Sequence, residues 1–202
     1  MPVADQNEVQ ATISPERERK ISRAFQGAWT DFQADKSKYG IWARTRANMM
    51  FERLAVRLQE QFAEDSNVRF FFGEETVKIT FDNLVVARCK KANDRGLGQN
   101  VLTQAVLTFC EAQQEIPGFS GLQKIEILYI VNQLGSAIDR IVVQARDGDM
   151  RLWAYTLNNE AEGGAVIEPL PAPTMPPPSH ASDLVKPRAK PLEGEETDNL
   201  GK

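Results

Sequence analysis

Apolar residues recur every three or four positions in two stretches of the first third of the chain, which is the spacing of one helix face. Ser14 and Pro15 open the first stretch, and a serine cap followed by proline predicts that a helix begins there. The apolar positions of this helix are Ile21, Ala24, Phe25, Trp29 and Phe32. A second helix is predicted from about residue 41 to 62. Its apolar positions are Ala47, Phe51, Leu54, Leu58 and Phe62.

From Val68 onward, apolar and polar positions alternate, as in strands with one buried face. Asp82 and Asn83 separate two of these segments and predict a tight hairpin. A helix over 101–114, capped by Asn100, divides the strands into two groups of three. The predicted strands are 68–72, 76–81, 84–91, 124–132, 138–145 and 150–157. The order predicts an α+β fold with two N-terminal helices and then βββ-α-βββ, in which a mainly antiparallel sheet carries helices on one face.

The composition divides the chain into three parts. Residues 1–13 are polar and unpatterned and are expected to form a flexible leader, whereas residues 14–157 are expected to form a single α+β domain. Residues 158–202 hold most of the prolines and few large apolar side chains, so they cannot bury enough surface to offset the entropy of ordering. This part is predicted to be a disordered, proline-rich, acidic tail. Its PLPAPTMPPP run favours polyproline II, either as a spacer or as a recognition segment.

The formal net charge of −4 comes from the predicted tail, because residues 1–159 contain 20 acidic and 20 basic residues. Overall charge therefore says little about the surface of the domain. The amino terminus lacks the basic start and apolar run of a secretory signal, and no apolar stretch approaches the roughly 18 residues of a membrane span. The sequence predicts a cytoplasmic protein without membrane association.

Cysteine and histidine usage limits the chemistry. Cys89 and Cys110 lack the spacing of a redox or zinc motif and are expected to be buried free thiols. The single histidine, His180, lies in the predicted tail, which removes the central residue of histidine-based catalysis and of histidine-bearing zinc sites from the domain. The sequence therefore favours a non-enzymatic protein with no catalytic residue, metal or cofactor.

The order of helix, three strands, helix and strand is similar to the core of PD-(D/E)xK nucleases. That family carries a (D/E)xK triplet in the third strand, but the residues two before Lys90 and Lys91 are Arg88 and Cys89, and neither is a carboxylate. The resemblance implies a degenerate, non-catalytic relative. Whether other carboxylates meet at a metal stays open, the candidates being Glu52, Glu74, Glu75 and Asp82.

The turn ANDRGLGQ links the third strand to the next helix and raises the question of a phosphate grip. It has neither the Walker pattern nor the third glycine of GxGxxG, so glycines that permit a tight turn are the favoured interpretation. Basic residues form two groups, with Trp42 and Tyr39 near one of them for stacking. The candidate partner-binding or nucleic-acid-binding residues are Arg46, Arg53, Arg57, Arg88, Lys90, Lys91 and Arg95.

Over about residues 41–157 the element order also resembles that of type III secretion chaperones, although no diagnostic motif accompanies it. The chain departs from that family in its additional N-terminal helix, in a third strand in the second half and in lacking an evident closing helix. The resemblance implies a non-enzymatic dimer that holds another polypeptide. The first hypothesis is a bacterial-type binding or regulatory protein with a protein partner, chaperone-like or toxin–antitoxin-like, and a possible homodimer. The alternative is a nucleic-acid-binding protein or degenerate nuclease that uses a basic surface.

Overall fold

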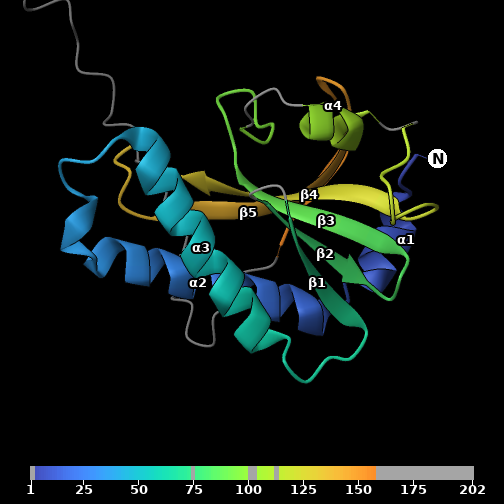
Figure 1. The fold of residues 1–202 in the computed structure, drawn as a ribbon, viewed down its shortest axis with the longest axis horizontal. Coiled ribbons are helices and arrows are strands. Elements are labelled where there is room, and N and C mark those ends of the chain that lie inside the picture. Colours follow the sequence, from blue (N-terminus) through green and yellow to red (C-terminus); the bar gives the residue numbers. More distant parts are fainter. Residues whose placement is uncertain (1–2, 74–75, 100–103, 112–113, 158–202) are drawn as a thin grey trace, which may run out of the picture. The chain divides into compact units, whose positions relative to one another are not determined.

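The computed structural model describes residues 3–73, 76–99, 104–111 and 114–157. Its centre is a six-stranded sheet in the order β1-β2-β3-β4-β5-β6 (Figure 1). All neighbouring strands are antiparallel except β3 and β4, which are parallel. The strands are β1 (Val68–Gly73), β2 (Thr76–Phe81), β3 (Val85–Lys91), β4 (Gln123–Val131), β5 (Ile138–Asp147) and β6 (Met150–Thr156). The predicted α+β class and mainly antiparallel sheet are confirmed.

Two long helices, α2 (Pro15–Ala34) and α3 (Ala43–Gln61), pack together against one face of the sheet (Figure 1). Ser14 caps α2, its hydroxyl accepting a hydrogen bond from the Arg17 amide at 3.5 Å. The core between helices and sheet contains Phe25, Leu54 and Leu58, all at most 2% exposed. A short 3-10 helix, η1 (Lys36–Lys38), follows α2.

The helix α4 (Gln104–Cys110) covers the opposite face of the sheet, where Phe109 joins Val86, Ile116 and Phe119 in a second apolar cluster. The sheet thus lies between two layers, with α2 and α3 on one face and α4 on the other. Val85, Val86 and Ala87 of β3 are all 0% exposed, so apolar side chains on both faces of this strand are buried by a neighbouring layer. The expectation that the helices lie on one face of the sheet is therefore wrong for α4. The apolar pattern of this helix showed that it packs on the sheet, but the pattern does not determine which face it covers. The predicted cap Asn100 lies outside the described residues.

The predicted flexible leader is corrected, because residues 1–13 include the helix α1 (Gln6–Thr12). The Asp5 carboxylate caps α1 by accepting from the Glu8 amide at 3.0 Å, and Val9 and Ile13 are 0% exposed. The Ala4 carbonyl accepts a hydrogen bond from Trp153 Nε1 at 2.6 Å, which ties the segment to β6. A helix this short buries one or two large side chains, too few to show as a periodic pattern. The predicted tail, 158–202, lies outside the described residues.

The first two turns of α3 extend beyond the core. Residues 42–48 are all exposed, including Ala47, which was expected to be buried, and Met50 takes the buried position. Tyr39 and Trp42, on the segment that enters the helix, are 73% and 85% exposed. Among the described residues, no helix combines the length and apolar character that a membrane span requires.

Candidate functional site

A cavity of about 800 Å³ opens on the sheet face opposite α2 and α3. Its floor includes Val142, which alternates along β5 with the core residues Ile141 and Val143 and so points away from the two long helices. Its walls are residues 91–96 and the turn between β4 and β5. Four basic residues line the cavity, which we call the basic hollow, and among its described lining residues Asp94 is the single acid. The basic residues are Lys91, Arg95, Arg140 and Arg151.

The wall at residues 92–99 is a compact loop that the glycines make possible. Asn93 organises it, its Oδ1 accepting from the amides of Arg95 and Leu97, both at 3.0 Å. Gly96 has φ +70°, which favours glycine, and its amide donates to the Asn93 carbonyl at 2.8 Å. Gly98 pairs with Ala92 and closes the loop. This geometry supports the structural interpretation of the glycines, because the loop is held by its own hydrogen bonds.

A line of hydrogen bonds fastens this loop to the sheet. Arg151 Nη2 donates to the Gly96 carbonyl at 2.6 Å, and Arg151 Nε donates to Gln144 Oε1 at 3.0 Å. Gln144 Nε2 in turn donates to Glu126 Oε2 at 3.1 Å. The guanidinium of Arg151 therefore has a structural task and contributes its charge to the hollow as well.

Arg88 is inside the protein, 4% exposed, with its guanidinium 4.8 Å from the centre of the Phe109 ring. It lies opposite Glu126 in the register of β3 and β4, and Arg146 Nη2 is 3.3 Å from Glu126 Oε1. Glu126, 1% exposed, thus offsets two buried positive charges. Burial, and then the charge of Arg88, lowers the pKa of Lys90. Arg88 lies beneath the surface, whereas Lys90 is half-buried, with its ammonium 5.8 Å from the centre of the Phe51 ring of α3.

The arginines of α3 are engaged on the helical layer. Arg53 pairs with Asp35, and Arg57 Nε donates to Asp31 Oδ2 at 2.9 Å. The hydrogen bond to Asp31 raises the pKa of Arg57, while hydrogen bonds from Ser37 lower the pKa of Asp35 more than Arg53 does.

The seven predicted binding residues therefore do not form one surface. Lys91 and Arg95 line the hollow, and Arg88 is buried beside Phe109 of α4. Lys90 is half-buried next to Phe51 of α3, and Arg53 and Arg57 of α3 are paired with acids on the helical layer. Arg46 is exposed at the start of α3, where its Nη1 donates to the Ile41 carbonyl at 2.7 Å. Sequence reasoning missed Arg140 and Arg151, because no local motif marks them and strand register brings them to the hollow.

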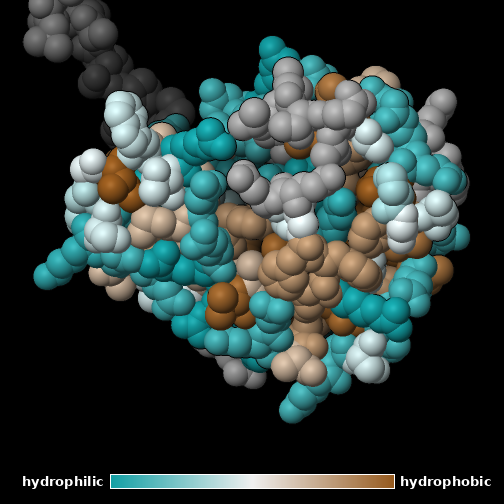
Figure 2. Space-filling view, in the orientation of Figure 1, coloured by the Kyte–Doolittle hydropathy of each residue, from teal (hydrophilic) through white to brown (hydrophobic). Residues whose placement is uncertain are grey.

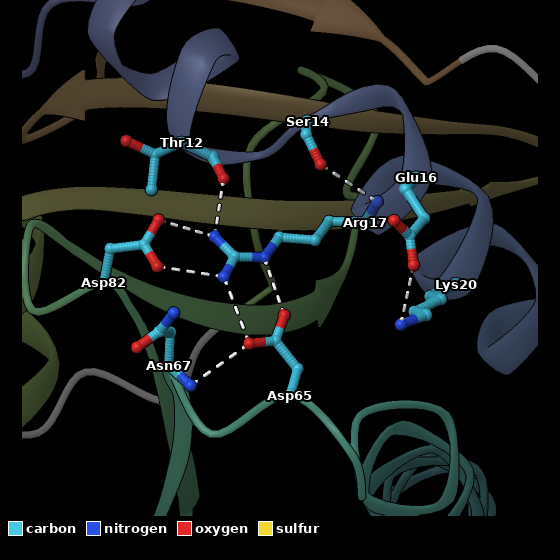
Figure 3. Close-up of polar contacts among 8 residues, drawn as sticks. All are labelled: Thr12, Ser14, Glu16, Arg17, Lys20, Asp65, Asn67 and Asp82. Atoms are coloured by element: carbon cyan, nitrogen blue, oxygen red, sulfur yellow. Dashed lines mark hydrogen bonds and ion pairs between the residues drawn. The ribbon is translucent and has the colours of Figure 1, made fainter.

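Asp82, a candidate metal ligand, is bound by Arg17 instead (Figure 3). Arg17 Nη1 donates to Asp82 Oδ2 at 2.6 Å, and Arg17 Nε donates to Asp65 Oδ2 at 2.9 Å. The hydrogen bond to Asp82 is the largest cause that raises the pKa of Arg17, and Arg17 holds the pKa of Asp65 below its ordinary value. Glu52 is exposed on α3.

No group of three or more potential metal ligands occurs among the described residues. Glu74 and Glu75, the remaining candidate metal ligands, come between β1 and β2 in the sequence and lie outside the described part of the chain.

The two cysteines are free and buried, as predicted. Cys89 belongs to the core beneath the helices, where burial raises the pKa of its thiol to about 12. Cys110 lies at the end of α4 on the opposite face and accepts a hydrogen bond from Arg146. Burial raises the pKa of Cys110 too.

No family model, curated protein or solved structure matches the chain. Guanidinium and ammonium groups at its surface are donors suited to phosphate oxygens. The hollow is equipped to hold an anion that presents several such oxygens.

Proposed function

We propose that the protein is a non-enzymatic nucleic-acid-binding protein whose basic hollow receives the phosphodiester backbone. The observation that carries the proposal is the gathering of Lys91, Arg95, Arg140 and Arg151 around one cavity of about 800 Å³ with Asp94 as the single described acid. Basic residues on such a surface displace the counterions that surround the backbone, and the release of these ions is the main source of sequence-independent affinity.

Ion pairing favours the basic hollow over α3 as the nucleic-acid-binding surface. Arg53 and Arg57 are paired with Asp35 and Asp31. Lys91 and Arg95 have no ion-pair partner among the described residues. The Nε atom of Arg140 lies 4.0 Å from an oxygen of its chain neighbour, and both side chains of this pair are more than half exposed. These three charges are available to a ligand, because a surface pair at that distance contributes little.

The test is fluorescence anisotropy with labelled single-stranded and duplex DNA between about 50 and 200 mM salt. The variant Arg95→Ala/Arg140→Ala removes two hollow charges, and Arg19→Ala/Arg23→Ala removes two exposed charges from α2 as a matched control. We expect the hollow variant alone to bind more weakly, with a slope of log K against log salt reduced by about 1.4 to 1.8. Equal affinities and slopes for the two variants, or no binding by the wild type at the lowest salt, would refute the proposal.

A second candidate function, binding of a protein partner, is favoured by the edge strand β1. Phe71 and Phe72 are 42% and 60% exposed, and apolar side chains gather over β1 (Figure 2). Among the described strands β1 pairs with β2 alone, so its outer edge offers backbone groups to which a partner could add a strand. If β1 binds a protein partner, Phe72→Asp should abolish capture of that partner from the native host. Met150→Asp changes an exposed residue at the opposite edge of the sheet and should preserve capture. Equal capture by both variants would exclude it.

A further inference from the structure

Exposed aromatic and basic side chains are concentrated where α2 is joined to α3. We call residues 36–48 the aromatic tip. Tyr39 is 73% and Trp42 85% exposed, although full burial of such a side chain is worth roughly 2–3 kcal/mol. In Figure 2 this segment, which Figure 1 places at the left, carries near-white and brown residues bordered by hydrophilic ones. The tip presents its rings to solvent rather than to the core.

The charge of the tip has one sign. Lys36, Arg44 and Arg46 are exposed, Lys38 adds a fourth basic residue, and residues 36–48 contain no acid. A surface that combines aromatic rings with basic groups complements a chain that combines bases with phosphates. The tip therefore has the chemistry of a stacking platform for nucleic acid.

Lys38 braces the tip from within. It is 8% exposed, and its ammonium donates to Gln33 Oε1 at 2.7 Å and to the Gln33 carbonyl. The same ammonium lies 5.2 Å from the centre of the Tyr39 ring. Tyr39 is therefore attached to the end of α2 by a cation–π contact, which reduces the entropy lost when a base stacks on it.

The turn between β4 and β5 links the tip to the basic hollow. Its residues Asn132, Gln133 and Gly135 line the hollow, and Figure 1 shows the connection from α2 to α3 near this turn. Gln33, which binds Lys38, also donates to the carbonyl of Gly135 at 3.4 Å, and Gly135 lines the hollow. Trp29 Nε1 adds a second link to this turn by donating to the Ser136 carbonyl at 3.1 Å. One bound chain can thus pass from the hollow across the turn to the tip.

We infer that the ligand is a single-stranded nucleic acid whose phosphates occupy the basic hollow while unpaired bases stack on Trp42 and Tyr39. The inference rests on the proposed function and narrows it. In a duplex the bases are paired and stacked on one another, so their faces are closed to the tip. In a single strand every base offers a free face, and stacking does not depend on its identity. The protein accordingly prefers single strands with little sequence selectivity.

The test compares three probes of equal length: oligothymidylate, its duplex with oligoadenylate, and a chain of abasic sugar phosphates. We expect the wild type to bind oligothymidylate most tightly. Trp42→Ala weakens that binding about tenfold, as the loss of one stacked base does, and leaves the abasic chain and the salt slope unchanged. Trp42→Phe retains most of the affinity. Leu84→Ala, which truncates another exposed apolar residue, is the control and has no effect.

Two results would overturn the inference. One is equal affinity of the wild type and Trp42→Ala for oligothymidylate. The other is binding to vesicles of anionic phospholipid that Trp42→Ala abolishes while oligothymidylate binding persists, since the tip would then be a lipid contact.

The hollow variant separates this inference from the proposed function. If Arg95→Ala/Arg140→Ala loses affinity and salt slope while Trp42→Ala loses neither, the hollow binds the backbone and the stacking inference fails alone. If Trp42→Ala loses affinity and the hollow variant does not, the tip binds nucleic acid without the hollow, and both the proposed function and the path across the turn fail.

Discussion

Gly98 lies so close to the carboxylate of Glu126 that a Cβ at Gly98 would be 2.8 Å from Glu126 Oε1. The carboxylate cannot easily move, because Gln144 and Arg146 hold it beneath the loop. We expect Gly98→Ala to lower the free energy of unfolding by about 1–3 kcal/mol, the usual cost of overpacking. Urea denaturation measures this change.

Gly73→Ala is the matched control for this substitution. Gly73 ends β1, and a Cβ there meets no atom of the described residues within 4 Å. We expect its effect to stay within about 0.5 kcal/mol, as for surface substitutions generally. Equal losses in the two variants would mean that the contact between Gly98 and Glu126 does not constrain the loop.

Glu126→Gln should be among the most destabilising isosteric changes in the domain. The variant leaves Arg88 and Arg146 without the buried negative charge that faces them, and removal of one partner from a buried ion pair costs about 3–5 kcal/mol. Glu64→Gln, at an exposed position, is the control and should be neutral. Thermal unfolding at low and high salt checks the mechanism, since a buried charge imbalance is poorly screened. Full recovery at high salt would contradict it.

The Arg17 contact with Asp65 predicts acid sensitivity. Arg17 holds the pKa of Asp65 below its ordinary value of 3.8, so the pair stabilises the fold above about pH 4 and this contribution is lost as the pH falls through the folded pKa. At pH 7 we expect Arg17→Met to lower the free energy of unfolding by about 2 kcal/mol. The difference in the free energy of unfolding between Arg17→Met and the wild type should become smaller below pH 4, because the unpaired carboxylates are then neutral. A difference that stays constant with pH would argue against a stabilising ion pair between Arg17 and Asp65. So would an equal loss of unfolding free energy in Arg19→Met.

Neither cysteine should react in the folded protein. Cys89 is 4% exposed with a pKa of about 12, and Cys110 is 6% exposed. We expect iodoacetamide at pH 8 to label both thiols only after denaturation, as followed by intact mass. The two thiols occupy different faces of the sheet, so no bridge between them should form on oxidation. Rapid labelling under native conditions would show that the sheet opens locally.

The strands were predictable because period-two alternation and turn residues coincide along the chain. The hairpin at Asp82 and Asn83 is confirmed, with φ values of 52° and 53° at these two residues. Its connection includes Leu84 as a third residue, because Phe81 pairs with Val85. Helix α3 was predicted from its apolar stripe, but Ala47 is exposed because the helix continues past the sheet that it covers. A stripe shows which residues share a face and not how far the opposing surface extends.

The site was less predictable than the fold, because it depends on register. Lys91 and Arg95 stood out as a local basic cluster, whereas Arg140 and Arg151 reach the same hollow from β5 and β6. Arg88 looked equally available in the sequence, yet the crossover through α4 buries it under Phe109. Strand alternation distinguishes two sides of a strand, and only tertiary packing decides whether both are covered.

The hydrogen bond from Trp153 to the Ala4 carbonyl joins residues 149 positions apart. During synthesis on the ribosome, Ala4 emerges long before Trp153. At about 5–20 residues per second, this delay is roughly 7 to 30 s. The Ala4 carbonyl must wait that long for its partner on β6, whereas the hydrogen bond from the Asp5 amide to Gln123 on β4 can form earlier, so the N-terminal segment docks in two steps.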